Sequence, residues 1–462
     1  MIDNNGVINN KTKLIYIPVF IQKSFNFRKI YFMFMRKFLL LPILFMSISV
    51  ISFSQKTAQE ILSKGIKLNI ADNPDYFVKL GTGIQVWGRY MQLNKNSIDT
   101  HGKSIESASD IALRRAYISS YAHLDRITMF AMFCMTSQPV NVSVSPFAKT
   151  APSFYFYDAW TSYSIHNEHL SIGMGLNMYN GLSRFSSASS ASTLTADVPI
   201  ISVPNLLTTE QQARQLSVFA TGKFGKFDYR IAIAKPFLCD MVPEIPQSNV
   251  SYEYENHNLS YKGYFQMQLF DKESHQMPFF TASYLGSKRI LNVGVGADYH
   301  PESTIVFDEN HDSSLHHKLH VGADVYLDIP IGKTSSITWY AGLFYFDYGP
   351  NYLLSYGTMD LFGNSLSEPQ QGTGIALHSQ IGYVLPIRQN NGHTTQVYAS
   401  AVYRDFEAIE NSNVHIDAGI NYYFAGHNAK VTIEGQFRPV LDNLMNDYYY
   451  RSIIIFKTQV FI

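Results

Sequence analysis

The stretch from His169 to Met178 alternates strictly between two kinds of side chain, and this alternation constrains the fold more than any other feature. Five apolar residues interleave with five small or polar ones: Leu170, Ile172, Met174, Leu176 and Met178 against His169, Ser171, Gly173, Gly175 and Asn177. A β-strand places successive side chains on opposite faces, so this segment has one apolar face and one polar face. The apolar face must meet either a protein core or lipid.

The composition favours lipid. Only 16% of the residues are charged and 14% are aromatic, whereas soluble proteins carry about 25% charged residues. Outside the N-terminal region, no segment offers the ~20 consecutive apolar residues of a spanning helix. Since only helices and closed barrels satisfy every backbone polar group in lipid, a membrane protein with this sequence must be a β-barrel.

The alternating pattern recurs along the chain in sixteen segments, and many have the ~9–11 residues that cross a bilayer at a tilt. We therefore predict an all-β, antiparallel transmembrane β-barrel of about 16 strands, with 14 to 18 compatible with the pattern. The predicted strands are Tyr76–Met91, Asp110–Leu124, Arg126–Met135, Phe154–Ile165, His169–Met178, Leu216–Phe224, Phe227–Ala234, Ser260–Phe270, Ile290–Tyr299, Leu319–Asp328, Ile337–Asp347, Ile375–Leu385, Gln396–Arg404, His415–Phe424, Lys430–Arg438 and Ser452–Ile462.

The connections between these strands alternate between short and long, as expected for periplasmic turns and outside loops. An even number of strands places both chain ends on the periplasmic side. One connection breaks the rule, because Phe270 to Ile290 should be short and is not. Either a pair of strands lies there unrecognised, or a periplasmic connection is extended.

A β-sandwich or a soluble propeller would also alternate, but its outer face would carry more charge. Here the non-apolar face holds Gly, Ser, Asn, Gln and Tyr with scattered charges. The last strand ends at Phe461-Ile462, which is similar to outer-membrane barrels, whose last strand ends in an aromatic or apolar residue.

The N-terminal region has the pattern of an exported protein. Met35-Arg36-Lys37 precedes the apolar run Phe38 to Phe53, so residues 35–54 are predicted to be a signal peptide. Residues 1–34 would then be an upstream extension, 55–75 a periplasmic lead-in and 76–462 the barrel. An anchor that begins at Met1 is the alternative. Loss of residues 1–54 removes seven bases and one acid, leaving 29 bases, 35 acids and a net charge of −6.

Four stretches carry a resemblance to a known family. They are Leu113-Arg114-Arg115-Ala116-Tyr117, Tyr157-Asp158-Ala159-Trp160, Gly175-Leu176 through Tyr179-Asn180-Gly181-Leu182-Ser183-Arg184, and Gly419-Ile420-Asn421-Tyr422-Tyr423 with Gly426-His427-Asn428-Ala429-Lys430. In this order they resemble Gram-negative porins of the phosphate-selective porin O and P type, in the form found in Bacteroidetes. The resemblance implies a sixteen-stranded barrel, commonly a homotrimer, that passes small solutes by diffusion.

In that family the third outside loop folds inward and narrows the pore, which makes residues 180–212 the expected constriction loop. Its Ser- and Ala-rich run suits backbone packed against a barrel wall that lines a water-filled cavity. Its charges are Arg184, Asp197 and Glu210. A mobile surface loop is the alternative.

Charged strand residues should face the lumen, because Arg or Lys on the lipid face at mid-depth costs ~2–4 kcal/mol. Strand parity assigns six bases and five acids to it: Lys79, Arg89, Arg115, Asp158, Asp228, Arg230, Asp298, Asp324, Lys430, Glu434 and Arg438. Arg114 breaks the parity and is expected at the outer water interface. Rings of side chains with one sign of charge select ions of the opposite sign. This near-balanced set therefore does not predict strong anion selectivity, and we do not transfer phosphate specificity from the porin O and P family to this chain. Ion pairs that brace the wall are an equal explanation for each residue.

The candidate pore-lining and constriction residues are Arg89, Arg115, Asp158, Arg184, Asp197, Arg230, Glu434 and Arg438. The sequence therefore predicts an outer-membrane porin for passive diffusion of small hydrophilic solutes or ions. Its expected partners are outer-membrane lipid, those solutes and its own copies in a homotrimer, with no nucleic acid, cofactor or metal.

Two rival functions stay open. One is a barrel hydrolase, although the sequence has no Gly-x-Ser-x-Gly and no His-Glu-x-x-His motif. It would need Ser, His and an acid to converge. The other is a non-conducting adhesin or scaffold, which a fully plugged lumen would favour. The histidines at 311, 316, 317 and 320 are more simply solvated loop residues than metal ligands. The two cysteines, Cys134 and Cys239, show no metal or disulfide spacing.

Overall fold

The structure is a computed structural model of the chain. It describes residues 66–70, 73, 75–98, 101–137, 153–206, 213–236, 250–253, 257–308, 310, 312–356, 368–386, 392–442 and 447–462. The predicted signal peptide and upstream extension, Glu210, Cys239 and His311 lie outside these residues. The described residues fall within one compact unit, Gln59–Ile462.

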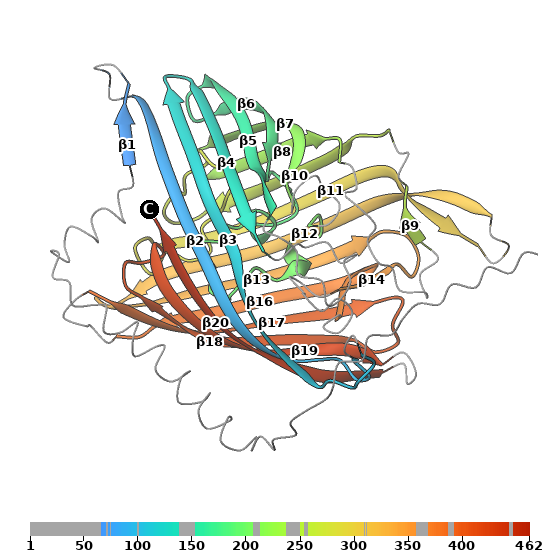
Figure 1. The fold of residues 1–462 in the computed structure, drawn as a ribbon. Helices are drawn as coiled ribbons and strands as arrows, with labels where there is room; N and C mark the ends of the chain where they lie inside the picture. Colours follow the sequence, from blue (N-terminus) through green and yellow to red (C-terminus); the bar gives the residue numbers. More distant parts are fainter. Residues whose placement is uncertain are drawn as a thin grey trace, which may run out of the picture. The chain divides into compact units, whose positions relative to one another are not determined.

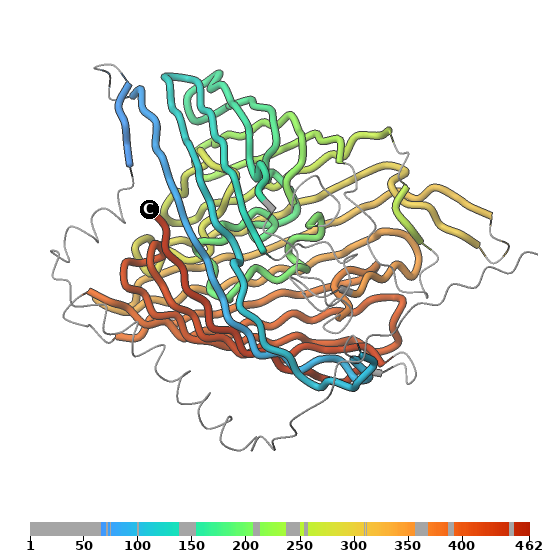
Figure 2. Tube along the Cα trace, viewed as in Figure 1, coloured from blue at the N-terminus to red at the C-terminus, as the bar shows by residue number. Residues whose placement is uncertain are grey.

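Sixteen strands form a closed antiparallel barrel, as the alternating pattern predicts (Figure 1). The first and last of them lie side by side (Figure 2), and Gly83–Met91 of β2 pairs with Ile453–Phe461 of β20 to close the sheet. The barrel strands are β2 (Tyr76–Gln92), β3 (Ser107–Leu124), β4 (Ile127–Thr136), β5 (Ser153–His166), β6 (Leu170–Asn177), β7 (Gln215–Phe224), β8 (Phe227–Ala234), β10 (Ser260–Gln268), β11 (Ile290–Phe307), β12 (Ser313–Ile331), β13 (Ser335–Asp347), β16 (Gly374–Val384), β17 (Thr394–Phe406), β18 (Asn413–Tyr423), β19 (Ala429–Asp442) and β20 (Asp447–Phe461).

Four short strands accompany the barrel. β1 (Ile66–Asn69) pairs with the start of β2, and β9 (Val250–Tyr252) pairs with the end of β11. β14 (Leu353–Tyr356) and β15 (Glu368–Gly372) form a separate hairpin. Two single 3₁₀ turns, η1 (Phe185–Ser187) and η2 (Ile200–Ser202), lie in the connection between β6 and β7. Within the described part of the chain, no helix is long and apolar enough to cross a membrane.

The two faces of the sheet differ as the sequence predicts. In β16, Ile375, Leu377 and Ile381 are exposed, whereas His378 and Gln380 between them are buried. The exposed outer face is therefore apolar and the enclosed inner face polar, the reverse of a soluble protein. This arrangement is stable only where lipid covers the outside.

The two ends of the barrel differ in their connections. At one end, which we call the turn end, β2 begins, β20 ends, and short turns join β3 to β4, β5 to β6, β7 to β8 and β12 to β13. At the opposite end, the loop end, lie most of the long connections, including residues 178–214. Residues 269–289 are a long connection at the turn end, so the Phe270–Ile290 exception is an extended connection and holds no further strand pair.

A charge on the outer face tests the lipid-facing surface. Ile118 lies in the middle part of β3 and is 60% exposed. We expect Ile118→Arg to lower the free energy of unfolding in vesicles by about 2–4 kcal/mol, because an arginine at mid-depth loses its hydration. Ile98→Arg, in the exposed β2–β3 connection, is the control and should cost about 0–1 kcal/mol. Equal losses in a denaturant titration would contradict a lipid-covered face.

Candidate functional site

The connection between β6 and β7, which we call the 178–214 loop, lies inside the barrel. The η1 and η2 turns are buried, together with Leu182 and Leu194. The loop backbone approaches the wall at two glycines. A Cβ added to Gly296 or Gly322 would lie only 2.5 or 2.7 Å from the carbonyl oxygen of Leu182. These glycines therefore provide the space in which the loop contacts β11 and β12.

Polar side chains from the far wall hold the same loop. Lys457 of β20 donates to the carbonyl of Ala196 at 2.5 Å, and Lys430 of β19 donates to that of Thr193 at 2.7 Å. Glu434 accepts a hydrogen bond from the Ala196 amide at 2.7 Å. The loop thus crosses the lumen from β11 and β12 to β19 and β20.

The connection between β10 and β11, which we call the 269–289 segment, contacts the loop. The two guanidinium nitrogens of Arg184 each lie 2.6 Å from an oxygen of Glu273, a buried bidentate pair. Burial alone would raise the pKa of Glu273, but the charge and hydrogen bonds of Arg184 hold that pKa below its usual range. The Phe280 amide and carbonyl exchange 2.8 Å hydrogen bonds with Ser187 and Ser189.

The segment also spans much of the turn end. Its Ser283 carbonyl accepts a 2.8 Å hydrogen bond from the Nε2 of His427, which lies in the turn between β18 and β19. The lumen is therefore narrowed from both ends, by the 178–214 loop and by the 269–289 segment.

Two β-bulges aim pairs of consecutive residues into the lumen. In β3, Gln85 pairs with Arg115 and Val86 with Leu113, so Arg114 is the extra residue, and both arginines are buried. In β5, Met132 pairs with Asp158 and Phe133 with Phe156. Tyr157 is the extra residue there, and both Tyr157 and Asp158 are buried. Bulges break strand parity and re-aim side chains. The expectation that Arg114 lies at the outer water interface is therefore wrong.

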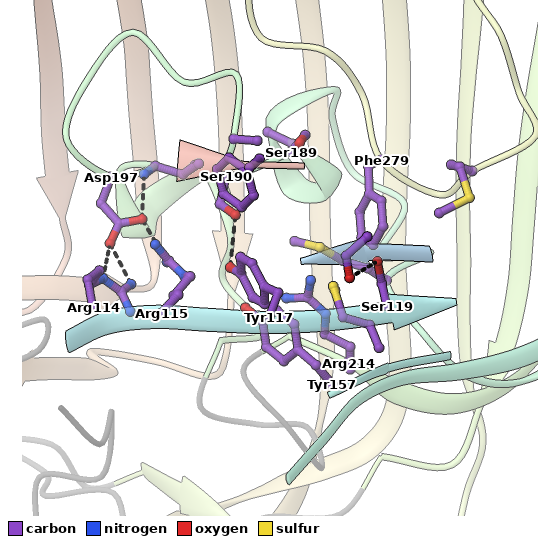
Figure 3. A pocket seen from close by; sticks show the side chains of 18 of the residues that line it. Arg114, Arg115, Tyr117, Ser119, Tyr157, Ser189, Ser190, Asp197, Arg214 and Phe279 are labelled. Carbon is purple, nitrogen blue, oxygen red and sulfur yellow. Dashed lines mark hydrogen bonds and ion pairs between the residues drawn. The ribbon is translucent and has the colours of Figure 1, made fainter. Parts of the chain in front are cut away.

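The two arginines of the β3 bulge bind one carboxylate of the loop (Figure 3). The Nη2 of Arg114 lies 2.5 Å from Oδ2 of Asp197, and the Nη2 of Arg115 lies 2.9 Å from Oδ1. Burial opposes ionisation of Asp197, but the charges of Arg114, Arg115 and Lys457 lower its pKa well below the usual range. Asp197 is therefore a fixed negative charge facing three bases.

Two cavities meet at this carboxylate. The larger, of about 280 Å³, runs along the β2–β5 wall and is lined by the 178–214 loop and the 269–289 segment. The smaller, of about 100 Å³, lies among Trp87, Arg89, Glu368, Arg404 and Arg438, toward the loop end. Asp197, Val198 and Ile200 line both. Asp197 and its two arginines thus lie at the boundary between the two cavities.

The eight candidate residues are all inside the barrel, in separate groups. Arg115 and Asp197 form the contact just described, and Asp158 lies beside them, 3.3 Å from Arg214. Arg184 and Arg230 both hold the 269–289 segment, Arg230 by donating to the carbonyl of Pro278 at 3.0 Å.

Arg89, Arg438 and Glu434 lie elsewhere on the wall. Arg89 and Arg438 line the smaller cavity, and Arg89 pairs with Asp110. Glu434 holds the loop at Ala196. Among the other residues assigned by parity, Lys79 is exposed near the start of β2, while Asp228, Asp298, Asp324 and Lys430 are buried. The pore-lining role of each residue stays a prediction.

Five residues of the site were not among the candidates: Arg114, Tyr157, Arg214, Glu273 and Lys457. Arg114 and Tyr157 depend on bulges, which no parity rule reveals. Arg214 is the last residue of the loop, directly before β7, and could have been found as a charge at a strand entry. Glu273 depends on the inward course of the 269–289 segment, and no sequence pattern gave that course.

The hydrolase alternative has one pair to consider. Ser202 and Nδ1 of His378 lie 2.8 Å apart, both buried. Within the described residues, the Nε2 of His378 has no hydrogen-bond partner, so no acid completes a triad. The same residues contain no group of three or more His, Cys, Asp or Glu side chains placed to hold a metal.

Comparison with known proteins identifies the fold. A scan against protein-family models and a sequence search of curated proteins both find no match. Among solved structures, Pseudomonas putida OprB at high pH aligns with 88% of this chain and 96% of its own, with a TM-score of 0.51 and 8% identity. The outer membrane channel DcaP of Acinetobacter baumannii aligns with 85% of this chain and 99% of its own, with a TM-score of 0.49 and 12% identity. Salmonella typhi OmpF in complex with daunomycin aligns with 86% of this chain and 100% of its own, with a TM-score of 0.47 and 10% identity.

At these identities the likeness defines the fold alone, and the OprB alignment carries it. The chain is a sixteen-stranded transmembrane β-barrel with the fold of outer-membrane porins. No comparison assigns it to the phosphate-selective porin O and P family.

The Arg184–Glu273 pair makes stability depend on pH. Glu273→Gln should lower the free energy of unfolding at pH 7 by about 3–5 kcal/mol, because a buried guanidinium loses its counter-charge. Since the pKa of Glu273 is depressed in the folded protein, its contribution is present above the unfolded value of about 4.3 and is lost as the pH falls through the lower folded pKa. The variant should therefore lose less stability than wild type upon acidification.

The control is Glu168→Gln, which removes an exposed pair with Lys272. That change should cost about 0–1 kcal/mol. Denaturant titrations at pH 7 and at pH 3 measure both variants. If the free energy of unfolding of Glu273→Gln falls between pH 7 and pH 3 as much as that of wild type, the Arg184–Glu273 pair does not anchor the segment.

Proposed function

We propose that the protein is an outer-membrane diffusion channel of the porin type that passes small hydrophilic solutes or ions. The observation that carries this proposal is the pair of cavities that meet at Asp197 inside a closed barrel. A polar interior that holds water allows diffusion through an outer-membrane barrel, and the two cavities along one wall leave room for a small solute. The turn end then faces the periplasm and the loop end the outside.

The selectivity we propose is weak. Among the described residues, thirteen buried bases accompany nine buried acids, and most are paired. Around the Ala196–Asp197 part of the loop, the bases Arg114, Arg115 and Lys457 accompany the acids Asp197 and Glu434. Because rings of one sign select ions of the other, this mixed set favours a general channel with a modest anion preference over a phosphate-selective one.

The proposal also includes the family relationship, the export and the oligomeric state expected from the sequence. We infer a relationship to the phosphate-selective porin O and P type in architecture, export through residues 35–54, and a homotrimer in the outer membrane. The single-chain barrel supports the membrane location through its apolar outer face.

Single-channel recording tests the proposal directly. We expect the mature protein, reconstituted in a planar bilayer, to give stable ohmic steps, with a reversal potential in a KCl gradient that shows little ion preference. Lack of conductance in repeated reconstitutions, with the barrel shown to be folded, would reject the channel and favour the plugged scaffold.

We expect Asp197 to control the preference of the channel for anions over cations. Asp197→Asn removes one negative charge and leaves the three bases Arg114, Arg115 and Lys457 around this position. The ratio of anion to cation permeability should therefore rise about two- to fivefold. This estimate takes a unit charge at contact distance in water as worth ~1 kcal/mol. Asp405→Asn makes the same charge change at an exposed site on β17 and is the control. Reversal potentials measure both, and an unchanged ratio in Asp197→Asn would remove Asp197 from the ion path.

A further inference from the structure

The larger cavity has a lining unlike that of a simple ion path. Five aromatic rings from four strands and the 269–289 segment surround it: Tyr117, Phe130, Tyr157, Phe279 and Phe461. Three methionines, Met132, Met178 and Met277, also line it, together with aliphatic residues of the 178–214 loop and Ile462. Sulfur and ring edges contact one another favourably. A hydrated inorganic ion gains nothing from such walls, so the lining calls for a solute with an apolar body.

The rings form two groups, with the rings of each group in contact. The centroid of Tyr117 lies 5.8 Å from that of Tyr157 and 5.9 Å from that of Phe461, and both pairs are stacked. Phe130 and Phe279 meet edge to face at 6.1 Å, which joins the strand wall to the 269–289 segment. A planar ring can therefore pack among them with the offset or edge contacts that aromatic pairs prefer.

One end of the same cavity is strongly basic. Arg114 and Arg115 line that end, whereas Arg214 lies among the aromatic rings, and Asp197 is the only acid in the lining. The Nη1 of Arg114 and the Nε of Arg115 have no hydrogen-bond partner among the described residues, although both side chains are buried. Arg214 is held with its guanidinium carbon 3.5 Å from the ring centroid of Tyr157. In Figure 3, Arg114 and Arg115 stand at one side and Phe279 at the other.

The β-bulges place both chemistries together. Without the extra residue in β3, only one of Arg114 and Arg115 could face the lumen. Without the extra residue in β5, only one of Tyr157 and Asp158 could do so. A regular sheet would not produce this juxtaposition, and bulges are found where a side chain must be re-aimed at a site.

Resting on the proposed channel function, we propose that this cavity is a binding chamber for small aromatic carboxylates, which deepens that function by naming a solute class. The arginine end takes the planar carboxylate, because guanidinium groups match it bidentately, in competition with Asp197. The aromatic end takes the ring. The volume of about 280 Å³ is just below the usual range for ligand sites, which suits a single-ring solute.

The lining argues against two other solute classes. A sugar needs many polar partners, and the hydroxyl groups here are few: Thr82, Tyr117, Ser119, Tyr157, Ser189 and Ser190. One of them, Tyr117, is already 3.1 Å from Ser190. Inorganic phosphate would use the arginines but leave the rings without a contact.

The test uses the mature protein and three probes, benzoate, acetate and inorganic phosphate, as potassium salts. Equilibrium binding to the detergent-solubilised barrel is measured by calorimetry, and transport by reversal potentials against chloride. We expect benzoate to bind about tenfold tighter than acetate or phosphate, since ring packing is worth ~0.5–1.5 kcal/mol per aromatic contact and 1.4 kcal/mol is tenfold.

Phe279→Ala should weaken benzoate binding about three- to tenfold and leave acetate unchanged. Phe270→Ala is the matched control, because Phe270 begins the same segment, is 44% exposed and does not line the cavity. If Phe279→Ala does not fold, Phe279→Leu keeps the bulk and removes the ring face, with the same expected direction.

The outcomes separate this inference from the channel function. Conductance with chloride and acetate, but no preference for benzoate in binding, overturns the chamber and leaves the channel. Tight benzoate binding that is lost in Phe279→Ala, without conductance, keeps the chamber and overturns the channel. Equal effects of the variants at Phe279 and Phe270 would also overturn the chamber.

Discussion

The strict alternation of a β-strand in a closed barrel is the constraint on which this structure depends. It gives each strand one face for lipid and one for the lumen, and closure between β2 and β20 leaves no unpaired edge in the membrane. Alternation also limits the lumen, since a regular strand can present only every second residue to it. The bulges in β3 and β5 lift this limit twice, and both extra residues, Arg114 and Tyr157, line the same cavity. The departures from regularity therefore mark the site better than the regular strands do.

Charges inside the barrel are buried, and burial would be costly without partners. The described bases accordingly meet acids or backbone carbonyls. Arg184 binds Glu273 and the carbonyl of Thr281, and Lys457 binds the carbonyl of Ala196. These contacts fix the 178–214 loop across the lumen and the 269–289 segment against it. The larger cavity remains between them and the β2–β5 wall, where Arg114 and Arg115 of β3 also hold the loop through Asp197.

The sequence predicts the barrel closely, because alternation is local and each strand carries its own copy of it. Ile375 to Val384 can be assigned to two faces from the sequence, and the structure agrees. The site is less predictable, since it depends on contacts between distant segments. Arg184 was a candidate from its place in the loop, but its partner Glu273 lies 89 positions away. The sequence marks the connection that holds Glu273 as unusually long and gives no sign that it folds inward. Arg114 was placed wrongly because parity counts residues and does not detect a bulge.

The position of Asp197 joins the electrostatics to the chemistry of the path. Its carboxylate occupies the two arginines that the β3 bulge turns inward, so the loop itself supplies an anion where a solute anion would bind. A solute carboxylate must compete with this internal one, which keeps the binding of simple anions weak. Additional contacts must then come from elsewhere along the path, and the aromatic walls directly beside the arginines are the one large apolar surface in the cavity. The weak charge selectivity and the ring preference that we propose thus have the same physical origin, a guanidinium pair that is already partly satisfied.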